Sequence, residues 1–329
     1  MIWTYILRRI LQAIPILIGV NILTFALFFF VNSPDDIARV HLGTKYITES
    51  AVQDWKQVHG YHLPLFYNQK EKNMKKLTET IFFQKSIKLF VLDFGLSDTG
   101  RDIKQAIGER YLPSLQLAIP VLIIGLLVNI AIALLLVLFR GTYLDLVGVF
   151  LCVVLISISA LFYIVAGQYL LAKLFRWLPI SGYIDGWHAI KFLLLPIMIS
   201  IFASLGSETR WYRALFLEEI DKEYVRTARA KGLSEFRVLF IHVLKNAMIP
   251  ILTGIVAILP LLFMGSLVME SFFAIPGLGS FTVDAIREQD FAIVRSMVFL
   301  GTVLYIFGLL LTDISYLWVD PRVRLESTQ

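Results

Sequence analysis

One acidic and three basic side chains mark a short stretch of the sequence, residues 223–233, as a candidate interaction surface. The stretch reads EYVRTARAKGL and lies between apolar segments at about 192–206 and 247–269. On a short helix, such side chains can pair with charges on a soluble partner protein. The sequence offers no nucleophile–base pair, and it contains no G-x-x-x-x-G-K-[ST] loop for ATP phosphates, no H-E-x-x-H and no G-x-S-x-G. These patterns favour binding or transport over catalysis.

The same stretch predicts two helices joined by a glycine turn. A helix is expected over residues 221–231, with Asp221 as its N-cap and Gly232 where a left-handed capping residue belongs. Ser234 can cap a second helix, and Glu235 in its first turn favours the helix dipole. Because the second helix runs into the next apolar segment, we expect the turn to lie at a membrane face.

The composition is typical of a polytopic membrane protein. Of the 329 residues, 57% are hydrophobic and 17% are charged, and the mean hydropathy is +0.74, which is too apolar for a soluble domain. The one cysteine, Cys152, lies in an apolar segment, which excludes a disulfide framework and favours a packing role. Six segments are candidate membrane helices, of which the fourth is short and needs its flanks: about 10–31, 115–139, 144–172, 192–206, 247–269 and 296–319.

The charge pattern predicts that both termini are cytoplasmic. Arg8 and Arg9 precede the first apolar segment, which is too long for a signal peptide and has no small-x-small cleavage site before Asn32. With this end inside, the inner segments hold 13 Lys and Arg, against five in the short outer segments. The long outer segment, 32–111, is left out because long segments translocate largely regardless of charge. A net charge of +5 spread over such loops does not suggest nucleic-acid binding.

The stretch at 223–233 resembles the cytoplasmic loop of permeases of binding-protein-dependent ABC importers, in the oligopeptide, dipeptide and nickel branch. The general loop of the superfamily, E-A-A-x-x-x-G, fits poorly, since Arg-Thr-Ala stands at 226–228 in place of E-A-A. A basic loop that only follows the positive-inside rule is the alternative interpretation. Other segments are similar to the same branch: RRILQAIP at 8–15, WLPISG at 177–182, ESFFAIPGLG at 270–279 and DPRVRL at 320–325.

The resemblance implies an all-α permease subunit with six transmembrane helices and the type I importer fold, in the cell inner membrane. It implies an N-terminal helix at 1–31, a long extracytoplasmic segment at 32–111, and a transmembrane core at 112–325 with a coupling loop at 207–246. The implied partners are a second homologous permease, two ATPase subunits, an extracytoplasmic solute-binding protein and the lipid bilayer. The chain itself would bind no cofactor, because ATP and Mg belong to the ATPase subunits. The solute stays open between an oligopeptide, a dipeptide, a nickel chelate and another small compound.

The resemblance also implies that the helix at 221–231 is a coupling helix, which docks on an ATPase subunit and transmits its closure to the spans. Gly232 would make the turn, Ala228 would keep the docking face small, and the charged side chains would pair with the partner. The implied coupling residues are Asp221, Glu223, Tyr224, Arg226, Thr227, Ala228, Arg229, Ala230, Lys231 and Gly232.

Polar side chains inside the apolar segments are candidates for a translocation pathway. Glu270 is one because ionisable residues at membrane depth are often functional, although it stands near a helix end. Interhelical hydrogen bonding is the alternative role for the uncharged candidates. No metal site is expected, because His59 and His62 have no third ligand nearby. The candidates are Asn129, Ser157, Ser159, Gln168, Ser200, Ser204 and Glu270.

Two departures from the branch carry expectations of their own. Residues 157–161 read SISAL where the branch often has S-I-P-S-F, and the missing proline predicts a third span without a kink. The Lys-rich insertion at 68–88, which includes KEKNMKK at 70–76, has no counterpart in the branch. A solvated insertion is favoured there over a contact with a binding protein.

Two other classes of protein compete with an ABC permease. An ion-coupled secondary transporter would more often show internal repeats, broken helices and mid-membrane charges. An intramembrane enzyme would need a catalytic constellation that the sequence lacks.

Overall fold

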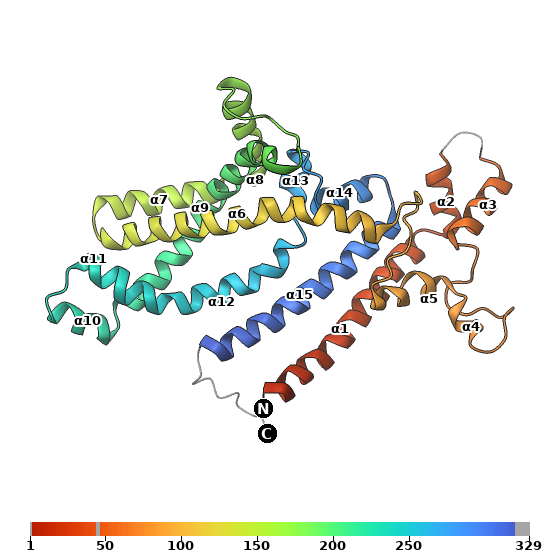
Figure 1. The fold of residues 1–329 in the computed structure, drawn as a ribbon, viewed down its shortest axis with the longest axis horizontal. Helices are drawn as coiled ribbons and strands as arrows, with labels where there is room; N and C mark the ends of the chain where they lie inside the picture. The colour runs from red at the N-terminus through yellow and green to blue at the C-terminus, as the bar shows by residue number, and fades with distance from the viewer. Residues whose placement is uncertain (1, 44–46, 320–329) are drawn as a thin grey trace. The chain divides into compact units, whose positions relative to one another are not determined.

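The computed structural model describes residues 2–43 and 47–319, and these residues form helices joined by turns and loops (Figure 1). The β pairing in this part of the chain is one isolated bridge between Leu96 and Asp102. The predicted all-α class is therefore confirmed. The DPRVRL motif at 320–325 lies outside the described residues. The chain divides into two compact units, residues 1–112 with 278–310 and residues 113–277 with 311–329.

The first unit contains short helices around an aromatic core. Ser33 begins α2 with a capping box, in which its hydroxyl accepts a hydrogen bond from the Asp36 amide (3.2 Å) and its own amide donates to the Asp36 carboxylate (3.0 Å). The buried core residues are Phe25, Phe29, Ile37, Tyr61 and Ile81. The elements of this unit are α1 (Ile2–Val31), α2 (Pro34–Leu42), α3 (Glu49–His59), α4 (Lys75–Thr78), α5 (Ile81–Lys85), η1 (Ile87–Val91), α14 (Leu278–Arg287) and most of α15 (Phe291–Val319).

A buried carboxylate in the first unit links the segment after η1 to the start of α15. Asp98 accepts a hydrogen bond from the Tyr61 hydroxyl (2.7 Å) through Oδ1 and one from the Ala292 amide (3.3 Å) through Oδ2. Burial, and secondarily the Asp98 charge, raises the pKa of the Tyr61 phenol well above its ordinary value. Since a buried charge is costly unless it is hydrogen-bonded, these contacts allow only one arrangement of the three segments.

The Lys-rich insertion is partly solvated and partly packed. Residues 70–76 are mostly exposed. Asn68 closes their loop, because its amide donates to the Lys76 carbonyl (2.9 Å) and its side chain to the Glu79 carbonyl (3.2 Å). In the following helix, α5, Ile81 is fully buried in the aromatic core. A solvated insertion therefore describes residues 70–76 but not α5.

The second unit is a helical bundle in which α9 packs against both α7 and α12. A Cβ atom at Gly206 of α9 would lie 2.6 Å from the carbonyl oxygen of Cys152 in α7, so only glycine fits at this crossing. The elements of this unit are most of α6 (Ile103–Leu138), α7 (Tyr143–Ser157), α8 (Ala160–Gly167), η2 (Gln168–Leu174), η3 (Gly186–His188), α9 (Ala189–Ile220), α10 (Glu223–Ala230), α11 (Glu235–Arg237), η4 (Val238–Val243), α12 (Leu244–Leu262) and α13 (Leu267–Phe272).

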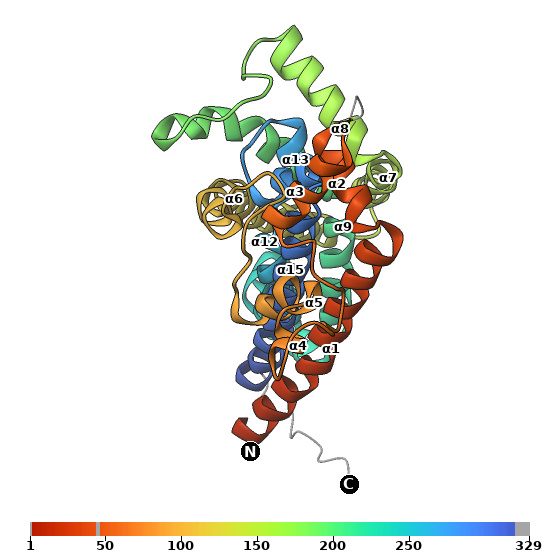
Figure 2. The same ribbon diagram turned by 90° about the vertical axis from the view of Figure 1, so that its right-hand side faces the viewer.

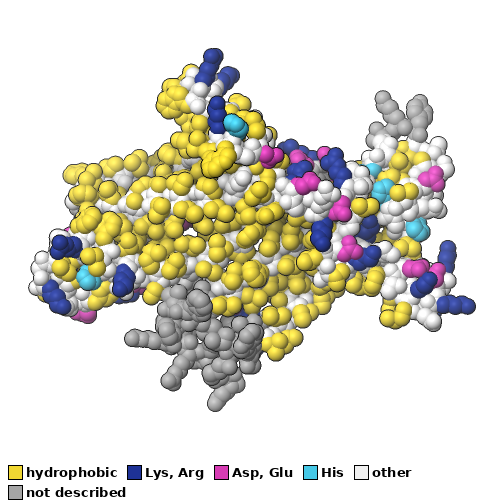
Figure 3. All heavy atoms as spheres, viewed as in Figure 1, with side chains coloured by type: hydrophobic (Ala, Val, Ile, Leu, Met, Phe, Trp, Pro, Cys, Tyr) yellow, Lys and Arg dark blue, Asp and Glu magenta, His cyan; other side chains and the backbone are white. Residues whose placement is uncertain are grey.

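Several helices are long and apolar enough to cross a membrane. Among the described residues there are five single helices of this kind, and one bent pair makes a sixth span when its members are counted together. The short fourth segment borrows from its flanks, as predicted, and becomes the 32-residue helix α9. Hydrophobic side chains cover the visible sides of α6, α7 and α12 (Figure 3). These helices are thus suited to a lipid environment.

The third span is sharply bent, so the prediction of a span without a kink is wrong. The axes of residues 143–157 and 160–174 differ by 92°, and the chain leaves the line of α7 at α8 (Figures 1 and 2). Ile158 is extended (φ −90°, ψ 130°), and the Ser159 hydroxyl accepts a hydrogen bond from the Leu161 amide (3.3 Å). A serine N-cap therefore starts a new helix at the position where the branch has a proline.

We predict that Gly206→Ala destabilises the protein, because the new methyl group meets a backbone carbonyl that cannot rotate away. Overpacking of this kind costs about 1–3 kcal/mol, which would lower the melting temperature in detergent by several degrees. Gly108→Ala is the matched control, since Gly108 also lies in a helix and a Cβ atom there meets nothing within 4 Å. Equal melting temperatures for the two variants would contradict the close crossing of α7 and α9.

Candidate functional site

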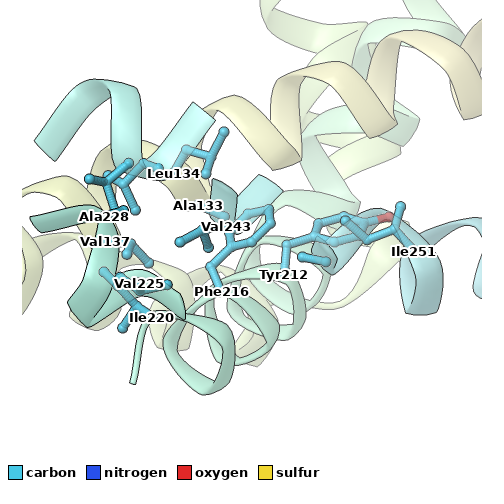
Figure 4. Packing of buried hydrophobic residues seen from close by; sticks show 13 residues of the cluster. Ala133, Leu134, Val137, Tyr212, Phe216, Ile220, Val225, Ala228, Val243 and Ile251 are labelled. Atoms are coloured by element: carbon cyan, nitrogen blue, oxygen red, sulfur yellow. The ribbon is translucent and has the colours of Figure 1, made fainter. Parts of the chain in front are cut away.

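Two apolar side chains attach α10 to the ends of longer helices. Val225 and Ala228 are buried, with exposed fractions of 0% and 4%, in a group of side chains from α6, α9, α10, η4 and α12 that we call the α10 cluster (Figure 4). The cluster consists of Ala133, Leu134, Val137, Tyr212, Phe216, Ile220, Val225, Ala228, Val238, Leu239, Val243, Ala247 and Ile251. Because packed interiors resist small displacements, α10 and the ends of these helices form one body.

The turn after α10 has the geometry that the sequence predicts. Gly232 is left-handed (φ +79°), and its amide donates to the Arg229 carbonyl (2.9 Å). The amide of Leu233 donates to the Ala228 carbonyl (3.4 Å). These two bonds define a Schellman motif, which satisfies the last carbonyls of the helix and requires a residue that tolerates positive φ. The predicted second helix follows, with Ser234 at the N-cap position of α11.

Helix α10 begins later than predicted. Helix α9 continues to Ile220, and Asp221 is its C-cap residue, so Lys222 occupies the N-cap position of α10. The Asp221 carboxylate lies 3.7 Å from the Arg140 guanidinium. The prediction of Asp221 as the N-cap is therefore wrong, because α9 extends through the residues that would have preceded a cap.

The face of α10 that points away from the cluster is charged and exposed. Arg226 donates to the Glu223 carboxylate (2.7 Å), and Arg229 forms a two-pronged pair with Glu235 (2.8 and 3.1 Å). Lys231 is exposed beside them. Figure 3 shows Lys and Arg side chains gathered over α10 and α11. Such solvated pairs contribute little to stability, so a partner protein can exchange them for its own charges at small cost.

Two of the predicted coupling residues face the protein interior. Ala228 was expected to keep a docking face small, but its side chain lies in the α10 cluster, and the exposed alanine of α10 is Ala230. Tyr224 donates its hydroxyl to Glu219 of α9 (2.5 Å). Burial, followed by this hydrogen bond, raises the pKa of Tyr224 to about 12. Both residues therefore fix α10 in place, and the outward face consists of the charged residues with Thr227.

Two of the predicted pathway residues come together between α6 and α9. Thr209 donates to Asn129 Oδ1 (3.2 Å), and Asn129 Nδ2 donates to the Ser204 hydroxyl (3.4 Å). Asn129 is buried, with 2% of its surface exposed. Asn129 and Ser204 thus take part in the interhelical hydrogen bonding that was the alternative to a pathway role. The sequence did not identify Thr209 as a candidate, because a threonine in a helix gives no local signal of a hydrogen bond to another helix.

The remaining uncharged candidates bond to backbone groups. Ser157 and Ser200 donate to carbonyls four residues back in their own helices (2.9 and 2.7 Å). Ser159 caps α8, and the Gln168 side chain donates to the Phe272 carbonyl (3.2 Å). These contacts shape and join helices, and they do not bring the four residues together.

Glu270 is an internal anchor of the segment that follows α12. Its side chain is fully buried, and its Oε1 atom accepts a hydrogen bond from the Ser266 amide (2.9 Å). A Cβ atom at Gly277 would collide with its carboxylate and would lie 2.5 Å from the Ser114 hydroxyl. These contacts give Glu270 a structural role, which is the role that its position near a helix end suggested.

Sequence reasoning missed an ion pair between α7 and α9. Arg213 donates through Nε and Nη2 to the two carboxylate oxygens of Asp145 (2.9 and 2.8 Å), and the side chains are 21% and 12% exposed. Asp145 stands in the first turn of α7, where an acidic side chain favours the helix dipole. That position was a signal for Asp145, but nothing local pairs it with a residue 68 positions away.

Comparisons with known proteins are consistent with a membrane transport component. Residues 110–325 match the family described as "Binding-protein-dependent transport system inner membrane component". A protein assigned in Brucella melitensis as a peptide transport system permease is 32% identical over 99% of this chain and 100% of its own length. The glutathione transport system permease protein GsiC of Salmonella choleraesuis is 31% identical over 98% of this chain and 99% of its own. The oligopeptide transport system permease protein AppB of Bacillus subtilis is 29% identical, with 97% and 99% covered.

We predict that Arg213→Met destabilises the protein far more than Arg226→Met. The first change leaves the Asp145 carboxylate without its partner at a mostly buried position, which costs about 2 kcal/mol or more, whereas the Glu223–Arg226 pair is 84% and 67% exposed and contributes little. Melting temperatures of the two variants in detergent measure the difference. Equal losses would show that burial does not distinguish the two pairs.

Proposed function

The chain belongs to the family of binding-protein-dependent transport system inner membrane components, and from this premise we propose that it forms one half of the translocation pathway of an ATP-driven peptide importer. As a permease subunit it is a transport component and not an enzyme. This family assignment replaces the two alternative classes of protein, the ion-coupled secondary transporter and the intramembrane enzyme. The peptide class rests on the names of the relatives, which specify peptides, oligopeptides and glutathione.

One observation carries the proposed mechanism: the α10 cluster joins an exposed, charged helix to the ends of α6, α9 and α12. A partner that displaces α10 would also displace these helices, because Val225 and Ala228 are packed among them. The helices would then move together as a rigid body. We propose that this partner is an ATPase subunit and that its outward contacts are made by Glu223, Arg226, Thr227 and Lys231.

The proposed complex contains a second homologous permease, two ATPase subunits and an extracytoplasmic solute-binding protein. ATP and Mg would be bound by the ATPase subunits. Closure of those subunits around ATP would favour the outward-open state, and hydrolysis would restore the inward-open state. The positive-inside bias of the short loops supports an orientation with both termini and α10 in the cytoplasm.

We predict opposite accessibility for two engineered cysteines in a Cys152→Ser background. Lys72→Cys should react with a membrane-impermeant thiol reagent in intact spheroplasts, because the insertion is exposed and would lie outside. Ser234→Cys is exposed as well but should react only after permeabilisation. The reverse pattern would place α10 outside and remove the proposed coupling to an ATPase.

We predict that Gly232→Val abolishes coupling while the protein still inserts in the membrane. A Cβ atom at Gly232 meets nothing within 4 Å, so the penalty comes from the left-handed backbone, which a β-branched residue strongly disfavours. Gly232→Asn is the matched control, since asparagine tolerates this conformation. The measurement is ATP hydrolysis stimulated by loaded binding protein in the reconstituted complex, at equal permease levels. Normal stimulation with Val would reduce this stretch to an ordinary basic loop.

A further inference from the structure

A pocket in the second unit lies between three helices that are long enough to span a membrane. It has a volume of about 410 Å³ and is walled by α6, α9 and α12. This volume is within the usual range for small-molecule sites. Most of its lining side chains are apolar, and the polar ones are Asn129, Ser204, Glu208, Trp211 and Tyr212. Glu208 is the one charged residue among the described residues that line it.

Glu208 stands in α9, two residues past the apolar segment at 192–206. It precedes Arg213 by five residues in α9, and Arg213 pairs with Asp145 in the first turn of α7. At 1.5 Å per residue, Glu208 lies about 7.5 Å further from that end of the bundle. Its side chain is half-buried among the mostly apolar side chains of the pocket, where a charged group is usually paired or hydrogen-bonded. No basic side chain within the described parts of the chain forms an ion pair with Glu208.

The other polar groups on the wall leave the carboxylate without charge compensation. Tyr212 forms a side-chain hydrogen bond with Glu208, but it carries no charge. Asn129 accepts from Thr209 and donates to Ser204, and the Ser204 hydroxyl donates to the Ile201 carbonyl (2.9 Å). They are neutral and already satisfied. A cation from outside this chain can therefore balance the acidic charge of the pocket.

The aromatic wall of the pocket suits a cation. Trp211 lines the pocket beside Glu208, and a Cβ atom at Gly254 of α12 would approach the edge of its ring to 3.2 Å. Because Gly254 has no side chain, there is space for the indole ring of Trp211. Ammonium groups are attracted both to carboxylates and to the face of an indole ring. An anionic ligand is repelled by the carboxylate, and a neutral ligand gains no ionic attraction from it.

We propose that this pocket is a water-accessible site for an organic cation, in which Glu208 selects the ammonium group of the transported solute. The identity of that cation rests on the proposed function, since the free amino terminus of a peptide is such a group. Glu208 would then be a specificity-determining residue of the permease itself, in addition to any selection made by a binding protein.

The test measures charge selectivity directly, without transport. The assembled transporter in nanodiscs carries Cys152→Ser and Ser204→Cys, and the reporter thiol reacts with a trimethylammonium-ethyl or a sulfonato-ethyl methanethiosulfonate. Ser204 and Glu208 are four residues apart in one helix and therefore neighbours. Relative to a free thiol, we expect the cationic reagent to be favoured about tenfold or more, because a nearby charge acts strongly at low dielectric. Glu208→Gln should remove this preference.

Glu218→Gln is the matched control, because Glu218 is an exposed acidic residue of the same helix outside the pocket. It should leave the rate ratio unchanged. A second reporter, Ile258→Cys on the α12 wall, guards against a local effect of the first and should show the same dependence on Glu208.

Three results would overturn the proposal: equal rates for the two reagents, a preference that survives Glu208→Gln, or no labelling by either reagent although the thiols react after denaturation. The last result would mean that lipid or the second permease fills the pocket, and a Glu208 paired with a basic residue of that permease would give equal rates. The outcome is separable from that of the proposed function. A cation-selective pocket in a complex without stimulated ATP hydrolysis would refute the coupling proposal alone.

Discussion

The burial of Val225 and Ala228 is the constraint on which the arrangement of the second unit depends. A helix of eight residues is unstable by itself in water, so α10 exists because its apolar side packs into the α10 cluster. The same packing aligns the end of α9 with the start of η4 and α12, since all three contribute to the cluster. A small side chain at 228 lets the backbone of α10 come close to its neighbours. Together with the hydrogen bond from Tyr224 to Glu219, this packing directs the charged face outward.

The ion pairs of this unit differ in how exposed they are and therefore in how easily they can be exchanged. The Asp145–Arg213 pair is mostly buried and two-pronged, and it joins α7 to α9. The pairs on α10 are more exposed than this pair and lie within that helix or between it and α11. A buried pair is costly to break, whereas an exposed pair costs little to exchange. The structure thus separates ion pairs that hold the bundle from ion pairs that a partner can replace.

Local rules predicted much of this structure, and long-range packing accounts for the rest. The turn at Gly232, the start of a helix after Ser234 and the spans follow from propensity, capping preference and apolar length, which the sequence displays directly, although the Ser234 side chain makes no capping hydrogen bond. The inward orientation of Ala228 depends on which face of α10 meets the other helices, and that is a tertiary choice. Asp145 and Arg213 are far apart in the chain, and the grouping of Asn129 with Ser204 needs α6 beside α9. Periodicity in one sequence does not specify such pairs.

The bend after α7 shows how a membrane helix can break without proline. Backbone groups that lose their helical partners must find others, because lipid supplies none. At this break the Tyr163 hydroxyl donates to the Leu155 carbonyl (2.7 Å), which also accepts from the Ile158 amide (3.3 Å). The Ser159 hydroxyl accepts from the Leu161 amide on the other side. Two hydroxyl side chains thus supply one hydrogen bond to each of the two helix ends. The absence of a proline therefore does not predict a straight span where nearby serine and tyrosine hydroxyls can bond to backbone groups at a break.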